Sequence, residues 1–368
     1  MSWFVIPSIA TIFENPKDYI LRVFSYGLLV LIDKVLYRLC RGNFKEEEMT
    51  KVLILGAGAV GGYYGGRLAE IGHDVTFLVR SKRKEIMAQH GLRIKSPAGD
   101  VTLQAKTLDQ EELQQQINNN GLFFDYVFLT SKAYDLDQAI DSIRPAMGKK
   151  TVLIPALNGM AHLEKLNHEF GKNNVMAGCV VIQSTLTGDG VIQHLNDEAF
   201  GFFGAQSGGI DNRAAIFAKL FDRAKGVKVA AVEDALQRMW NKWVRLATLA
   251  GMTCLMRANV GEICRAPGGE KAMVNLLMAN NAIATAVGYP LAPNQLKDTE
   301  NFLTNHESLA TASMLRDIEQ GHLTEGDHIL GDLLKRSQYY GIDNPILSLC
   351  YTHVKAYEQR RLSERDKR

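Results

Sequence analysis

The sequence predicts an α/β fold class, in which a domain with a parallel sheet is followed by an all-α domain. Apolar strands alternate with helical segments up to about residue 209, the order typical of parallel sheets. From there to about residue 360 only helical spacing recurs. The 368 residues also exceed the size at which a single hydrophobic core usually stops growing, so two domains are expected.

The composition is that of an ordinary globular protein and narrows the range of partners. Hydrophobic residues make up 46% of the chain and charged residues 22%, and the net charge of +2 is too small to indicate a nucleic-acid partner. The five cysteines are odd in number and widely spaced, which predicts reduced thiols and a cytoplasmic location. The nine histidines show no metal-ligand spacing, so no metal site is expected.

The first 48 residues form an apolar N-terminal extension that allows two interpretations. Residues 19–39 are unusually apolar, but their longest uncharged run, 23–32, rises only about 15 Å as a helix, which is half of a hydrocarbon core of about 30 Å. An amphipathic helix against the body, a partner or a membrane surface is therefore favoured over a membrane span. Alternatively, translation begins at Met49, directly before the first strand, and residues 1–48 are not part of the native protein.

A glycine-rich turn carries the strongest signal in the chain. Residues 51–55 form a continuous apolar run typical of a parallel strand buried on both faces. This strand leads directly into the turn Gly56-Ala57-Gly58-Ala59-Val60-Gly61. A helix over 63–71 and a second strand over 74–79 follow. This order predicts a Rossmann-type dinucleotide-binding domain, because the helix N-terminus then faces the pyrophosphate.

Each glycine of the turn has an expected role. Gly56 permits the tight turn, Gly58 lets the backbone approach the pyrophosphate, and Gly61 lets the helix pack close to the strand. The second strand ends at Arg80 rather than at an acidic residue. Since arginine at this point accommodates the 2′-phosphate, the predicted cofactor is NADP(H) rather than NAD. The basic run 82–84 follows at once.

Two polar residues follow later strands of the same predicted sheet. Lys132 comes after the strand expected over 123–130, and Asn158 after the strand expected over 151–154. Ligands bind at the carboxyl ends of parallel strands, so both side chains are expected to line the cofactor cleft. Further strands are expected over 175–183 and 200–203.

The second half of the chain is predicted to be helical. Asp211 is a plausible N-cap for the first helix. Helices are expected over 211–224, 233–257, 269–287, 298–320, 324–340 and 344–359. The expected division is a Rossmann-type domain over 49–209, a helical substrate and catalytic domain over 210–360, and a charged tail over 361–368. The cleft between two such domains is a common place for a small-molecule site.

These features together resemble the 2-dehydropantoate 2-reductase (ketopantoate reductase) family, over about residues 51–360. Besides the glycine turn, the resemblance is carried by Leu129-Thr130-Ser131-Lys132-Ala133, Leu157-Asn158-Gly159-Met160, Trp240-Asn241-Lys242-Trp243, Val260-Gly261-Glu262, and Ser313-Met314-Leu315-Arg316-Asp317-Ile318 with Thr324-Glu325. The order and spacing of these motifs are more specific than any one of them alone.

The resemblance implies a role for each matching residue. Lys132 and Asn158 would contact the nicotinamide-ribose side of NADPH, with Ser184 near the same cleft. Lys242 would be the catalytic acid and contact the substrate, because an ammonium can stabilise and protonate the oxygen of a carbonyl that receives hydride. Glu325 would act in catalysis, at the substrate or the nicotinamide.

Substrate contacts are expected from Ser313 and Asn259, although Asn259 stands one position before the family's asparagine, which is Val260 here. The chain departs from the family pattern one and two turns beyond Lys242. There Leu246 and Ala250 replace asparagines that bind the substrate. A site that loses such groups loses discrimination for a hydroxyl, so the substrate is expected to be more apolar or differently shaped.

The resemblance implies reduction of a 2-oxo acid to a 2-hydroxy acid with NADPH, with 2-dehydropantoate to pantoate, in pantothenate biosynthesis, as the leading candidate reaction. Two alternatives stay open: a non-catalytic NADPH-binding regulator, and a hydroxyacid dehydrogenase of other specificity. The fold cannot separate them. The expected partner is a small 2-oxo acid, and a homodimer is an open option.

Overall fold

The structure is a computed structural model and describes residues 49–365. The predictions for 1–48, including a membrane contact of 19–39, lie outside these residues, as does the end of the charged tail at 366–368. Residues 50–365 belong to one compact unit. The division into domains at 209 and 210 therefore stays a prediction.

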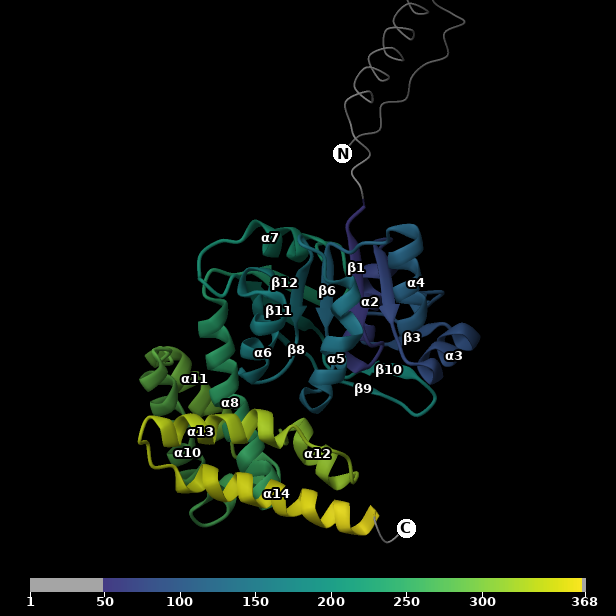
Figure 1. The fold of residues 1–368 in the computed structure, drawn as a ribbon. Coiled ribbons are helices and arrows are strands. Elements are labelled where there is room, and N and C mark those ends of the chain that lie inside the picture. The colour runs from purple at the N-terminus through teal and green to yellow at the C-terminus, as the bar shows by residue number, and fades with distance from the viewer. Residues whose placement is uncertain (1–48, 366–368) are drawn as a thin grey trace, which may run out of the picture. The chain divides into compact units, whose positions relative to one another are not determined.

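The central sheet is parallel, as predicted. Its strands, in spatial order, are β5 (Lys106–Leu108), β2 (Asp74–Leu78), β1 (Lys51–Leu55), β6 (Tyr126–Leu129) and β7 (Val152–Pro155). The order reverses beside β1, because the chain builds outward through β2 and then returns to place β6 on the other side. In such sheets the reversal opens a crevice at the strand ends. The glycine turn, Lys132 and Asn158 all follow strands at this edge (Figure 1).

The helices of the α/β part connect strands of this sheet with one another or belong to connections with two further sheets. They are α2 (Ala59–Glu70), α3 (Ser81–His90), α4 (Gln110–Asn120), α5 (Leu136–Ile143), α6 (Ala161–Phe170) and α7 (Asn212–Lys219), with short 3₁₀ turns at Ala133–Asp135, Arg144–Ala146 and Lys172–Asn174. Asp211 caps α7 as predicted, since its side chain accepts the backbone N–H groups of Arg213 and Ala214.

A second sheet packs on α2. Its strands, in order, are β4 (Val101–Leu103), β3 (Leu92–Lys95), β10 (Val191–His194) and β9 (Ser184–Leu186). Two glycines of α2 let this sheet come close. A Cβ at Gly62 would lie 2.3 Å from Ile192 Cδ1, and one at Gly66 would lie 2.6 Å from Ile94 Cδ1. The helix is thereby held between two sheets, which fixes the direction of its N-terminus.

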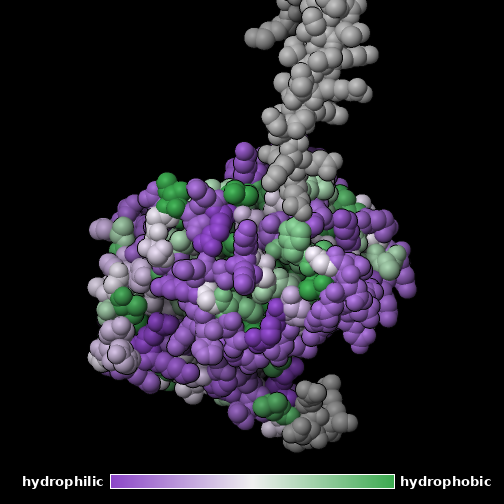
Figure 2. Space-filling model, turned by 45° about the horizontal axis from the view of Figure 1, so that its top comes forward, coloured by the Kyte–Doolittle hydropathy of each residue, from purple (hydrophilic) through white to green (hydrophobic). Residues whose placement is uncertain are grey.

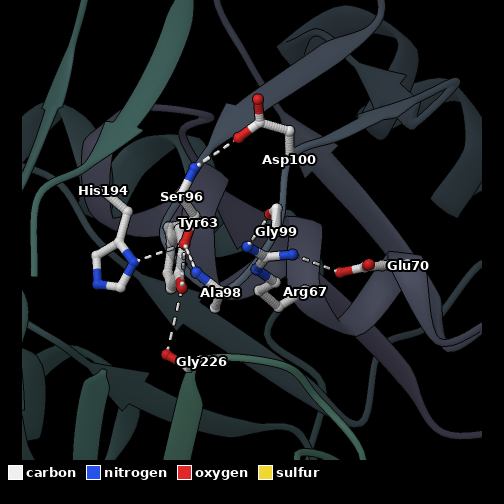
Figure 3. Close-up of polar contacts among 9 residues, drawn as sticks. All are labelled: Tyr63, Arg67, Glu70, Ser96, Ala98, Gly99, Asp100, His194 and Gly226. Atoms are coloured by element: carbon white, nitrogen blue, oxygen red, sulfur yellow. Dashed lines mark hydrogen bonds and ion pairs between the residues drawn. The ribbon is translucent and has the colours of Figure 1, made fainter. Parts of the chain in front are cut away.

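Polar contacts behind α2 fasten the turn between β3 and β4 (Figure 3). Arg67 is fully buried and donates to Glu70 Oε2 and to the Gly99 carbonyl, both at 2.7 Å. Ser96 Oγ lies 2.9 Å from His194 Nδ1 at the end of β10. Arg67 thereby links α2 to the turn, and Glu70 gives its buried charge a partner.

A third sheet joins the α/β part to the helices. Its strands are β12 (Val227–Ala231), β11 (Ala199–Gly204) and β8 (Ala177–Val181), in that order. The sequence analysis did not predict β12, which pairs in parallel with β11. The α/β architecture thus extends to Ala231, past the boundary expected after residue 209.

The rest of the chain is helical, as predicted (Figure 1). Its elements are α8 (Ala235–Met256), α9 (Val260–Arg265), α10 (Gly269–Val287), α11 (Pro293–Leu303), α12 (Ser313–Glu319), the π-helical turn η5 (Asp327–Gly331), α13 (Asp332–Tyr339) and α14 (Pro345–Arg365). The single helix expected over 298–320 is two helices with a loop between them. Asn305 and Ser308 bond to nearby backbone N–H groups in this loop, which competes with helix formation.

Helix α8 links the two parts of the structure. Trp240 and Trp243 are each 1% exposed and belong to one hydrophobic core that continues from the central sheet through α8 to α14. Among residues 49–365, no helix has the length and apolar character needed to cross a membrane. On the face shown in Figure 2, hydrophilic residues predominate and hydrophobic ones form small separate groups.

Candidate active site

The glycine turn has the geometry that its sequence predicts. Gly56 has a φ of +88°, and its N–H donates to the Leu78 carbonyl at 2.9 Å. A Cβ at Gly61 would lie 2.3 Å from Thr130 Oγ1, so only glycine lets α2 start this close to the sheet. At Gly58 no atom lies within 4 Å of the corresponding position, which leaves the turn open to an approaching ligand.

The start of α2 is suited to bind phosphate. Gly58 precedes the helix and makes no side-chain cap. The first backbone N–H groups of α2 therefore keep their capacity to bind an anion, and the helix dipole favours negative charge there. Ser184, at the start of β9, donates to the Ala59 carbonyl at 3.1 Å. This contact places Ser184 beside the turn.

Two arginines follow the second strand. Arg80 is 71% exposed in its side chain and contacts Gln138 Oε1 at 2.7 Å and Asp135 Oδ2 at 3.4 Å. Arg83 instead holds the glycine turn, because its Nε donates to the Ala57 carbonyl at 2.9 Å. Arg80 is thus exposed after β2 and held by Gln138 and Asp135, whereas Arg83 is a structural support of the turn.

Three predicted residues from distant segments meet at the strand ends. Glu325 is only 6% exposed, and its carboxylate accepts from Lys132 Nζ at 3.3 Å and Asn158 Nδ2 at 3.5 Å. The backbone N–H of Ala133 also donates to it, at 3.2 Å. Burial alone disfavours the charged form of Lys132, but Glu325 and Asp317 outweigh it and raise the pKa of Lys132. The buried carboxylate and the ammonium therefore stabilise each other.

Lys242 reaches the same place from α8. Its Nζ donates to Asn158 Oδ1 at 2.9 Å and to the Val180 carbonyl at 2.8 Å. Burial lowers the pKa of Lys242, although Cys179 and Glu325 oppose the shift. A lysine of lowered pKa gives up its proton more readily than an exposed one, which suits a general acid.

A small pocket adjoins this lysine. The residues that line it are Leu157, Asn158, Gly159, Cys179, Met239, Lys242, Trp243 and Leu246. Only Asn158 and Lys242 have strongly polar side chains in this set. Leu246, which stands where the resembled family has an asparagine, is part of this lining, and Ala250, one turn further, is fully buried. The wall next to Lys242 is therefore apolar.

The two remaining predicted substrate residues lie elsewhere. Asn259 caps α9, where its Oδ1 accepts from the Glu262 backbone N–H at 2.9 Å. Ser313 is the first residue of α12 and is exposed. Within residues 49–365 neither forms a hydrogen bond to Lys242. Their roles as substrate contacts stay predictions.

Sequence reasoning missed three side chains at the site. Asp317 lies 3.6 Å from Lys132 Nζ. It belongs to the motif over 313–318, in which only Ser313 was predicted to contact the substrate. His162, which is buried, and His328, which is half-buried, form a pair with their Nδ1 and Nε2 atoms 3.1 Å apart. Their positions four residues after Asn158 and three after Glu325 were the available signal. In the part of the chain that the structure describes, no group of three potential ligands is placed to hold a metal ion.

Together, the parallel sheet with its glycine turn and the lysine and glutamate at its strand ends define a Rossmann-type oxidoreductase. The chain belongs to the ketopantoate reductase family. The family model described as ketopantoate reductase PanE/ApbA matches residues 52–205, and the model of the same family's C-terminal part matches residues 234–358. The predicted family, fold class and class of enzyme are confirmed.

Similar proteins span nearly the whole of the described chain. An uncharacterized oxidoreductase of Bacillus subtilis, YkpB, is 34% identical over 84% of this chain and 99% of its own. A 2-dehydropantoate 2-reductase of Archaeoglobus fulgidus is 26% identical over 80% of this chain and 94% of its own.

Solved structures show the same architecture. The 2-dehydropantoate 2-reductase of Methylococcus capsulatus superposes with a TM-score of 0.75 at 25% identity, over 84% of this chain and 97% of that one. A D-mandelate dehydrogenase, solved with NADH and anilino(oxo)acetate, superposes with a TM-score of 0.74 over 85% of this chain and 99% of that one. At 21% identity, the second match shows the fold alone.

Proposed function

We propose that this protein reduces a 2-oxo acid to a 2-hydroxy acid with NADPH. The observation that carries the proposal is the position of Lys242. Its buried ammonium lies 2.9 Å from Asn158 at the carboxyl edge of the sheet, next to Glu325 and on the same edge as the glycine turn. Related proteins named 2-dehydropantoate 2-reductases support this reaction class.

The residues at the turn fit a dinucleotide. The open space at Gly58 and the start of α2 would receive the pyrophosphate, and Lys132 and Asn158 would hold the nicotinamide-ribose side. Arg80, exposed at the end of β2, supports a 2′-phosphate contact and hence NADP(H) over NAD(H). When bound, the cofactor supplies the hydride.

The protein side of the reaction is charge stabilisation and proton transfer. Negative charge develops on the carbonyl oxygen of the substrate as its carbon is reduced. Lys242 Nζ would stabilise this charge and donate a proton to the oxygen. Asn158 and the Val180 carbonyl keep the ammonium in one direction, since both accept hydrogen bonds from it. The Glu325 carboxylate accepts hydrogen bonds from Lys132 Nζ and from the Ala133 N–H and so holds Lys132 in place.

The substrate that the family suggests is 2-dehydropantoate, with a related 2-oxo acid as the other candidate. Leu246 and the apolar wall next to Lys242 favour a substrate with fewer polar groups. A role in pantothenate biosynthesis, a cytoplasmic location and a homodimer stay predictions.

An assay of NADPH oxidation tests the proposal. The purified protein should oxidise NADPH with 2-dehydropantoate or with more apolar 2-oxo acids, and Lys242→Ala should lower turnover by roughly 10²–10⁴-fold, the usual contribution of a general acid. NADPH binding by the variant should stay close to that of the wild type. Tight NADPH binding with no turnover on any 2-oxo acid would contradict the proposal and favour a regulatory NADPH-binding protein.

A further inference from the structure

A fully buried histidine and a half-buried one face each other between the α/β part and the helical part. His162 is in the first turn of α6 and 0% exposed, and His328 belongs to the turn η5. His162 Nδ1 and His328 Nε2 are 3.1 Å apart, which is the distance of a hydrogen bond between the two rings. The pair thus connects two segments that are 166 residues apart in the chain.

His328 is also connected to two segments that carry residues of the site. The backbone N–H of His328 donates to the Glu325 carbonyl at 3.1 Å. On the other side, a Cβ at Gly159 would lie 2.8 Å from the His328 carbonyl oxygen and 2.9 Å from its ring. The loop that carries Asn158 is therefore packed directly on His328.

The turn η5 is fastened to the third element of the site as well. Trp243 Nε1 donates to the Ile329 carbonyl at 2.9 Å, and Trp243 is the neighbour of Lys242 on α8. The segment after Glu325 thus has one hydrogen bond to α6, between the two rings, and another to α8, the helix of Lys242. These two bonds hold the segments that carry Asn158, Lys242 and Glu325 in fixed relative positions.

The bond between the rings depends on their protonation. One ring must donate and the other accept, so a pair with both rings protonated has no acceptor and repels itself. His162 Nε2 is buried and has no partner among the described residues, so a proton there would be buried without a hydrogen bond. The neutral pair, with Nδ1–H of His162 as the donor, avoids this cost.

The surroundings of the pair favour the neutral form. Burial lowers the pKa of His162, and His328 and Lys242 lower it further. Burial also lowers the pKa of His328, while Glu325, Asp332 and a hydrogen bond with the Asn158 backbone oppose the shift. These are the titratable groups that face the pair from α8, from the segment before η5 and from α13.

We propose that His162 and His328 are positioning residues, which hold Asn158 and Glu325 in register with Lys242 through their single ring-to-ring hydrogen bond. The inference rests on the proposed reduction of a 2-oxo acid. Neither ring touches the reacting atoms. The pair instead aligns Asn158 and Glu325 with Lys242. This alignment requires that one ring nitrogen of the pair remains a hydrogen-bond acceptor.

The test compares variants that break the bond with variants that keep it. His162→Leu and His328→Leu remove a ring nitrogen. His162→Asn and His328→Gln place an amide where Nδ1 and Nε2 lie and allow the bond to persist. We expect the leucine variants to lower kcat by about tenfold or more, the effect of losing one buried hydrogen bond and leaving its partner unsatisfied. The amide variants should recover most of this loss, and the NADPH dissociation constant should change by less than about threefold in all four.

A matched control separates positioning from general stability. His194 is also buried, its Nδ1 also makes one bond, to Ser96 at 2.9 Å, and its Nε2 also lacks a partner among residues 49–365 (Figure 3). His194→Leu should lower the unfolding temperature as His162→Leu does, without the change in kcat. The pH dependence of kcat provides a second readout, because a purely structural role would leave it unchanged. The acid limb of kcat should shift to lower pH in the H162N/H328Q protein and stay in place in His194→Asn.

The outcomes distinguish the two proposals. A wild-type protein that reduces no 2-oxo acid overturns the proposed function and, with it, the positioning role. An active wild type whose leucine variants at 162 and 328 keep kcat and the pH profile overturns the positioning role alone. Equal losses of kcat in the leucine and the amide variants also overturn it, because the hydrogen bond would then be irrelevant.

Discussion

Lys242 Nζ lies 2.9 Å from Asn158 Oδ1, although the two residues come from different halves of the fold and are 84 positions apart. The same amide donates to Glu325 at 3.5 Å. Asn158 is therefore the group through which the ammonium on α8 and the carboxylate before η5 are held together. Its oxygen and nitrogen serve the two oppositely charged partners, which an aspartate or a leucine could not do.

Replacement of Asn158 tests this role. Asn158→Ala should lower kcat by about tenfold or more, because Lys242 keeps only the Val180 carbonyl as an acceptor and its direction is less well defined. Steady-state kinetics with a saturating 2-oxo acid measure the effect. Asn167→Ala is the control: it breaks an amide pair with Gln206 at 2.9 Å on α6, so it should reduce stability and leave kcat unchanged. A normal kcat in Asn158→Ala would remove Asn158 from the site.

Arg80 should determine the preference for NADPH. Its side chain is 71% exposed, so Arg80→Ala should fold normally and raise the KM for NADPH by about tenfold, the effect of one charge-assisted contact screened by solvent. The KM for NADH should change little, since NADH has no 2′-phosphate. Kinetics with both cofactors measure this. Lys82→Ala, at an exposed position two residues further on, serves as the control. A wild-type preference for NADH would refute the cofactor prediction.

Much of the cofactor-binding edge of the central sheet could be predicted, because the sequence patterns that indicate it are local. The strand before Gly56 and the position of Arg80 after the next strand are readable within thirty residues. The meeting of Lys132 with Glu325 is different, since 193 residues separate them. The family resemblance implied only that both residues act at the cofactor and substrate site, and their direct contact was not predicted, because neither residue type nor spacing carries information about packing between two domains.

The features that were missed depend on long-range pairing. Strand β12 has the sequence Val-Lys-Val-Ala-Ala. This pattern is too short to distinguish a strand from a loop, and the strand is recognised only from its pairing with β11. The histidine pair is similar. Each imidazole alone is ordinary in the sequence, and only the packing of η5 on the Asn158 loop gives the pair a role.

Acid should destabilise the fold below about pH 6.5, the pKa of an exposed histidine. Burial lowers the pKa values of His162, His194 and His328. As the pH falls below 6.5 the unfolded chain takes up protons that the folded protein does not, so the unfolded state is favoured. The loss continues until the pH reaches the lower pKa of the folded state.

The expected size is about 1 kcal/mol for His162 between pH 7.5 and 5.5, and urea unfolding at the two pH values measures the total. The H162N/H328Q protein should show a smaller loss, because it lacks two of the imidazoles whose pKa values are lowered in the fold. Carboxylates such as Asp211, whose pKa is lowered by a side-chain hydrogen bond with Arg213, act only at more acidic pH and do not confound this window. Equal stability at both pH values would show that the imidazoles titrate normally in the fold.

Leu246 should set the substrate preference of the pocket. Two acids differ only in one hydroxyl: 2-dehydropantoate has a hydroxymethyl group where 3,3-dimethyl-2-oxobutanoate has a methyl group. Because Leu246 offers no hydrogen bond next to Lys242, the wild type should use the second acid at least as well as the first. Leu246→Asn should then raise the ratio of kcat/KM for the hydroxylated acid over the methyl acid by about tenfold, the effect of one recovered hydrogen bond.

Ala250 cannot serve for this test, since it is fully buried and an asparagine would overpack the core. Leu249→Asn is the matched control, a half-buried leucine of the same helix outside the pocket lining. An unchanged ratio in Leu246→Asn, with both acids reduced, would place the substrate's hydroxyl away from α8 and leave the reductase activity itself intact.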